Sequence, residues 1–140
     1  MDFNLRLLEI RDQEDLKKEL NLIGSSPAGC DLMAHKGLFY VMRADNLSVP
    51  AALILKQALL SIGGDVAVHE QVIVNKVENT SVILMATVAQ YLLLADKLKC
   101  QQFRMPILAA EIRKLLSACE QQKYIIPCKK QNLVCGEKTL

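Results

Sequence analysis

The segment after residue 62 brings several chemically capable residue types close together. Asp65 and His69 are four residues apart, so on a β-strand their side chains would project from the same face. Along such a strand they would lie roughly 13 Å apart, too far for a direct hydrogen bond unless the chain bends at His69. This pattern could serve acid–base catalysis in a small free-standing enzyme, contact a ligand or partner, or form a solvent-exposed strand edge. The strand edge requires the fewest assumptions, and the sequence predicts no catalytic residue.

Two glycines precede this segment. Gly63 and Gly64 follow an apolar helical pattern and precede a β-rich run, whereas a phosphate-binding loop places its glycines at the start of a helix. Their position predicts a helix stop and a tight turn. The alternative is a backbone that approaches a neighbouring chain or a ligand, such as a small anionic metabolite beside Lys56. The candidate ligand or interface residues are therefore Lys56, Gly63, Gly64, Asp65 and His69.

The cysteines and the second histidine give no further site. The five cysteines are odd in number and contain no C-x-x-C pair, which is typical of reduced thiols in a cytoplasmic protein. Zinc sites need close ligand pairs, so no metal and no cofactor is expected in this chain. A nucleophile formed by Cys30 and His35 would require contact in space that the sequence does not indicate. The cysteines are Cys30, Cys100, Cys119, Cys128 and Cys135.

Composition predicts one globular domain. The 140 residues are 51% hydrophobic and carry a net charge of +2 without a basic cluster, which argues against nucleic-acid binding. The start of the chain lacks the pattern of a signal peptide. The longest apolar-rich stretch, Ser81 to Leu98, contains Thr87, Gln90, Asp96 and Lys97 and is typical of a strand followed by a helix, not of a membrane span.

The hydrophobic pattern predicts an α/β (α+β) domain, with about four helices packed on a mixed β-sheet of about four to five strands. Asp12, Ser48 and Pro50 mark helix starts, while Gly24 and Gly63 mark helix ends. The run 82–87 is apolar on both faces, which is typical of a central strand. Strands are expected over 4–10, 38–43 (ended by Asp45 and Asn46), 65–74 with a bend at 69–71, and 82–87; helices are expected over 13–23, 49–62, 88–99 and from 106, with a turn over 25–28 and a helical turn over 29–35.

The last residues predict a second region. Residues 1–122 suit a compact domain, and 123–140 read as a linker and a truncated β-hairpin. A half-hairpin is not a stable ending, so we expect the polypeptide to continue into a further domain. Its apolar edge, or an edge of the sheet, could also pair two copies of the chain.

Several blocks of the chain resemble one enzyme family. Residues 55–68, 82–87 and 98–103 are similar to blocks of the N-terminal accessory domain of some bacterial dihydropteroate synthases, and 132–140 resemble the run that leads into the catalytic barrel of that family. The resemblance implies a parent enzyme that joins dihydropterin pyrophosphate to para-aminobenzoate in folate biosynthesis, on a (β/α)8 barrel that allows Mg2+ as a cofactor. The family's pterin and pyrophosphate motifs are absent here, so no catalytic residue carries over.

This resemblance implies a non-catalytic N-terminal domain, whose main partner is the barrel of the same polypeptide. It is expected to bind neither nucleic acid nor membrane. The alternative is a free-standing regulatory module that binds a small metabolite.

Overall fold

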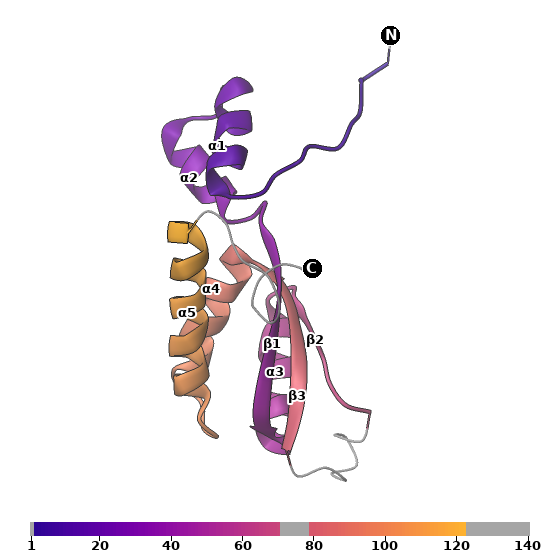
Figure 1. The fold of residues 1–140 in the computed structure, drawn as a ribbon, viewed down its shortest axis with the longest axis vertical. Coiled ribbons are helices and arrows are strands. Elements are labelled where there is room, and N and C mark those ends of the chain that lie inside the picture. The colour runs from indigo at the N-terminus through magenta and orange to yellow at the C-terminus, as the bar shows by residue number, and fades with distance from the viewer. Residues whose placement is uncertain (1, 71–78, 123–140) are drawn as a thin grey trace.

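A computed structural model describes residues 2–70 and 79–122 of the chain (Figure 1). It confirms the predicted α/β class and its single domain. The second half of the predicted 65–74 strand pair, the linker and the half-hairpin lie outside these residues. The elements are α1 (Gln13–Leu22), α2 (Pro27–Ala34), β1 (Phe39–Ser48), α3 (Val49–Ser61), β2 (Asp65–Ala67), β3 (Asn79–Thr87), α4 (Val88–Leu98) and α5 (Met105–Gln122).

The sheet of the described residues has three strands in the order β1-β3-β2. It therefore has fewer strands than the predicted four to five. Both pairings are antiparallel, so the sheet is not mixed as predicted. The central position of β3 agrees with its apolar character on both faces. Val41 and Asp65 both lie opposite Met85, on the two sides of β3.

β1 extends beyond the predicted end at Asp45 and Asn46. The register shifts between Ala44 and Leu47, which marks a bulge, and Asn46 has a φ of 64° within it. A bulge lets a strand absorb residues that do not fit the ladder and then resume pairing. The two turn-forming residues therefore bend the strand without ending it.

The predicted strand over residues 4–10 is wrong. Residues 2–11 form an extended arm without strand pairing that leads away from the domain before α1 (Figure 1). Alternation of apolar residues favours a strand, but a strand also needs a hydrogen-bonding neighbour, and the arm has none among the described residues. α1 then begins after the predicted cap Asp12, whose side chain accepts a hydrogen bond from the backbone N–H of Asp15.

α2 begins earlier than predicted. Ser26 caps it and accepts a hydrogen bond from the Gly29 N–H, while Pro27 occupies its first turn. The expected turn over 25–28 is therefore partly helical. The predicted cap Ser48 is confirmed for α3, where its hydroxyl accepts a hydrogen bond from the Ala51 N–H at 3.3 Å.

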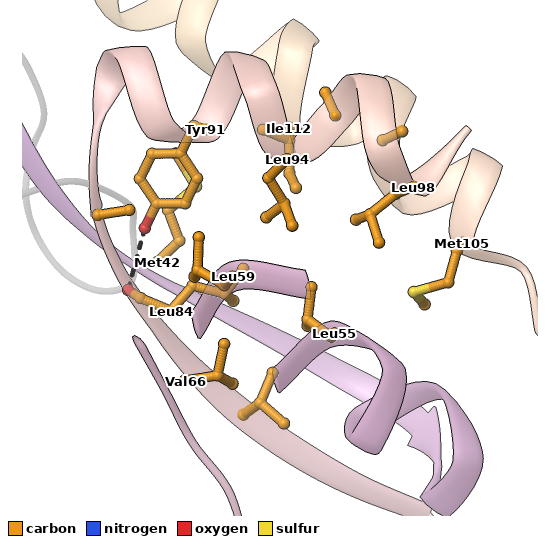
Figure 2. Packing of buried hydrophobic residues seen from close by; sticks show 14 of the residues in the cluster. Met42, Leu55, Leu59, Val66, Leu84, Tyr91, Leu94, Leu98, Met105 and Ile112 are labelled. Carbon is orange, nitrogen blue, oxygen red and sulfur yellow. Dashed lines mark hydrogen bonds between the residues drawn. The ribbon is translucent and has the colours of Figure 1, made fainter. Parts of the chain in front are cut away.

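The core lies between one face of the sheet and helices α3 and α4, with α5 packed on α4 (Figures 1 and 2). Tyr91 of α4 is fully buried, and its hydroxyl donates to the carbonyls of Tyr40 at 2.8 Å and Leu84 at 3.0 Å. This contact ties α4 to both β1 and β3. The other large, fully buried side chains are Leu55, Leu59, Val66, Val82, Leu84, Leu94 and Leu98.

No helix in the described ranges has the length and apolar character that crossing a membrane requires.

Candidate functional site

Four of the five predicted site residues come together where α3 leads into β2. The Lys56 Nζ atom lies 3.2 Å from Asp65 Oδ1 and donates a hydrogen bond to the Val66 carbonyl at 2.7 Å. The Val66 N–H donates to the Asp65 carboxylate, and this bond, followed by the one from Lys56, lowers the pKa of Asp65. Both charged side chains are thus already partnered, and they join α3 to β2.

The two glycines have structural roles at this corner. Gly63 has a φ of +100°, and its N–H donates to the Leu60 carbonyl, while the N–H of Gly64 donates to the Leu59 carbonyl. These two bonds form a Schellman motif, so the predicted helix stop is confirmed. A Cβ atom added to Gly64 would lie 3.0 Å from the carbonyl oxygen of Met85 in β3. The backbone approach that these glycines permit is therefore to the chain's own central strand.

His69 does not share a strand face with Asp65. β2 ends at Ala67, so the alternation on which that prediction rested stops two residues before His69. The histidine is exposed in the irregular segment that follows. The structure therefore does not support the argument that Asp65 and His69 act together as an acid–base pair on one strand face.

Sequence reasoning missed a groove on the other side of the domain. It has a volume of about 720 Å3 and lies between the second half of β1 and the first half of α5. Three of the four non-glycine residues with positive φ in the described chain line it: Asn46, Phe103 and Arg104, at 64°, 59° and 67°. Such conformations are unfavourable for residues with a Cβ, and they concentrate at functional sites.

The floor of the groove is apolar and its rim is charged. On the rim, Arg43 Nε lies 2.9 Å from Asp45 Oδ1, and the Ser81 hydroxyl and then Arg43 lower the pKa of the Asp45 carboxyl. Arg104 and Glu111 make no ion pair with another described residue. This combination suits a flat, largely apolar ligand with polar groups at its edge. The apolar lining residues are Met42, Ala44, Leu47, Ala51, Leu84, Phe103, Met105, Ile107, Leu108, Ile112 and Leu115.

A smaller cavity of about 340 Å3 lies between α1 and the end of α5. His35 and Cys119 line it, and burial raises the pKa of the Cys119 thiol, which disfavours the reactive thiolate. Cys30 is buried, and its thiol lies 3.4 Å from the Asn21 side-chain oxygen, to which it donates. These contacts give no support to a nucleophile formed by Cys30 and His35.

Metal ligands do not gather in the part of the chain that the structure describes. No group of three or more His, Cys, Asp or Glu side chains there could hold a metal ion.

One sequence signal pointed to the groove. Phe103 and Arg104 stand in the short connection between two helices, where no glycine or proline accounts for the turn. An aromatic and a cationic residue in a tight connection are candidates for surface contacts. The rest of the groove comes from β1, far away in the sequence, so the pattern alone could not assemble it.

The molecule is thus a small α/β domain with an apolar groove, and part of its sequence is similar to a known protein. Over 103 residues, 74% of this chain, it is 35% identical to the bifunctional dihydropteroate synthase/dihydropteroate reductase of Helicobacter pylori (strain ATCC 700392 / 26695). The match covers 27% of that protein, so the chain spans about a quarter of the length of this relative. No protein-family profile and no solved structure matches the chain.

Proposed function

We propose that this chain is an accessory, non-catalytic domain of a folate-biosynthesis enzyme, N-terminal to a synthase barrel outside these 140 residues. The observation that supports this proposal is the similarity of 103 residues to about a quarter of a bifunctional synthase and reductase. A (β/α)8 barrel needs around 250 residues, more than the matched stretch supplies. The synthase activity of the relative therefore requires chain beyond the match.

A role in contact, not in synthase chemistry, is favoured by the side chains at the predicted corner. Lys56 and Asp65 are paired with each other, and Gly63 and Gly64 end a helix. These residues stabilise the junction between α3 and β2. The domain would then act by contacting the barrel.

The test of this role uses the relative and the isolated chain. Removal of the matched stretch from the Helicobacter pylori protein should leave its synthase turnover in place. The isolated 140-residue chain should not condense dihydropterin pyrophosphate with para-aminobenzoate. Turnover by the isolated chain would refute the non-catalytic role in synthesis.

The groove favours a second candidate function, the binding of a pterin-type ligand. The relative is also named for a dihydropteroate reductase activity, which could involve a stretch outside its synthase part. A groove of about 720 Å3 falls in the range of small-molecule sites, roughly 300 to 1,000 Å3. Its apolar floor could hold a flat ring, while Arg104 and Glu111 could bind polar groups at the ring edge.

Thermal unfolding with dihydropteroate, dihydropterin and a nucleotide tests this second function. A ligand at a hundred times its Kd should stabilise the fold by about 2.7 kcal/mol. Arg104→Ala and Ile107→Asp should abolish the stabilisation if the ligand lies in the groove, since both residues line it. Lys56→Met is the matched control, and loss of stabilisation in this variant alone would favour the anionic-metabolite site at the α3–β2 corner. A chain that no ligand stabilises would leave contact as its role.

A further inference from the structure

Four charged side chains line the groove, and two of them are paired with each other. Arg43 Nε lies 2.9 Å from Asp45 Oδ1, and the Ser81 hydroxyl also donates to this carboxylate. These partners satisfy the two charges that β1 contributes. Arg104 and Glu111, on the helix side of the groove, make no ion pair within the described part of the chain. They are therefore the charges that the groove offers to a ligand.

The two unpaired charges stand at separate places along one wall. Arg104 directly precedes α5, and Glu111 follows it by seven residues, close to two helical turns or roughly 10 Å along the helix axis. Side chains on a helix pair most readily when they are three or four positions apart, so this spacing does not favour a mutual ion pair. Ile107 and Leu108 lie between them in the sequence and line the same groove. The wall thus has a cationic end, an apolar middle and an anionic end.

The cationic end suits an aromatic anion. α5 begins at Met105, and the N-terminus of a helix carries a partial positive charge that adds to that of Arg104. Phe103 and Arg104 have φ values of 59° and 67°, which glycine would adopt without strain. The chain nevertheless has an aromatic ring and a guanidinium at these two positions, and both line the groove. A carboxylate attached to an aromatic ring would find a partner for each of its parts here.

We propose that the groove binds a pterin joined to a benzoate group, as in dihydropteroate, in one orientation. The benzoate carboxylate lies at Arg104, and the amino-pyrimidinone edge of the pterin ring lies at Glu111. This inference rests on the second candidate function, the binding of a pterin-type ligand in the groove. It adds which end of the ligand each charged side chain recognises.

The hydrogen-bonding groups match at both ends in this orientation. The pterin edge presents a ring N–H and an amino group side by side, so it can donate to both oxygens of the Glu111 carboxylate. The Arg104 guanidinium can donate two parallel bonds to the benzoate carboxylate. In the reverse orientation the benzoate would face Glu111, and two like charges would repel each other. A pterin without the benzoate group keeps only the Glu111 end and should therefore bind more weakly.

Isothermal titration calorimetry of the 140-residue chain with dihydropteroate and with dihydropterin tests the orientation. Arg104→Gln removes the charge but keeps most of the side-chain stem. It should raise the dissociation constant for dihydropteroate at least about tenfold and leave that for dihydropterin unchanged. Glu111→Gln should raise both dissociation constants, because both ligands carry the pterin edge and a carboxamide has only one acceptor oxygen.

Lys114→Gln is the matched control. It makes the same change of charge as Arg104→Gln at an exposed residue of α5 that does not line the groove, so it should alter neither dissociation constant. The orientation is wrong if Arg104→Gln weakens both ligands alike or neither, or if Glu111→Gln leaves dihydropterin binding unchanged. A wild-type chain that binds neither ligand would instead refute the second candidate function, and this inference with it.

Discussion

Replacement of Tyr91 by phenylalanine tests how the helices are fixed to the sheet. The side chain is fully buried, and its hydroxyl donates to the Tyr40 carbonyl of β1 and to the Leu84 carbonyl of β3. Figure 2 shows the second of these bonds. Phenylalanine keeps the ring and its packing, so the change isolates the hydroxyl. Loss of a buried hydrogen bond that leaves carbonyls less well satisfied costs about 1 to 3 kcal/mol. We expect Tyr91→Phe to lower the free energy of unfolding at pH 7 by this amount.

The effect of the same substitution on the free energy of unfolding should depend on pH, and the direction of this dependence follows from the pKa shift of Tyr91. Burial raises the pKa of Tyr91, while the Met42 backbone N–H opposes this shift. Because the folded pKa lies above the unfolded value of about 10, the stabilisation of the neutral phenol is complete below pH 10. It is lost above pH 10, by about 1.4 kcal/mol at pH 11. The Tyr91→Phe variant has no ionisable group at this position. The excess stability of the wild type over the variant should therefore be about 1.4 kcal/mol smaller at pH 11 than at pH 7.

Urea denaturation of both proteins at pH 7, 9 and 11 measures the effect. Ionisation of the other tyrosines and of the lysines is common to both proteins and cancels in the difference. Equal m-values would show that both unfold the same amount of surface. A difference that stays constant from pH 7 to pH 11, or a variant as stable as the wild type at pH 7, would refute the role assigned to the hydroxyl.

Three further changes have expected outcomes. Thr87→Ala removes the capping box with Gln90 at the start of α4, and thermal unfolding should show a loss of about 1 kcal/mol. Gly24→Ala and Gly63→Ala each place a Cβ at positive φ, which should lower the free energy of unfolding by about 1 to 2 kcal/mol. The loss should be larger for Gly63→Ala, because of these two positions only Gly63 would bring the new Cβ close to a side chain, Gln90 Nε2 at 2.9 Å. Asp65→Asn should flatten the acid limb of the stability curve, since the lowered pKa of Asp65 gives a contribution that is present above pH 4 and lost as the pH falls further.

The features predicted correctly from the sequence are those that depend on neighbouring residues. Asp12, Ser48 and Gly63 act at helix ends as predicted, because cap geometry is set within one turn of the chain. The central strand was recognisable because burial on both faces leaves a continuous apolar run. In each case the physical cause lies within about ten residues of the effect.

The errors and the missed groove share an opposite cause. The arm over 4–10 has the alternation of a strand, but pairing depends on a neighbour that the sequence does not specify. Asp45 and Asn46 are turn formers, yet pairing with β3 on both sides of the bulge keeps the strand intact. The groove requires α5 to lie beside β1, and that placement is set by the packing of α5 on α4. Tertiary packing decides all three features.

β1 contributes to the groove on both sides of its bulge. Alternate residues of a strand point to opposite faces, so Met42 and Leu47, five residues apart, share the inward face only because the register shifts between Ala44 and Leu47. Phe39 and Val41 point away from the core and do not line the groove. Substitution of these outward residues should therefore leave ligand stabilisation unchanged, whereas substitution of the inward residues should reduce it.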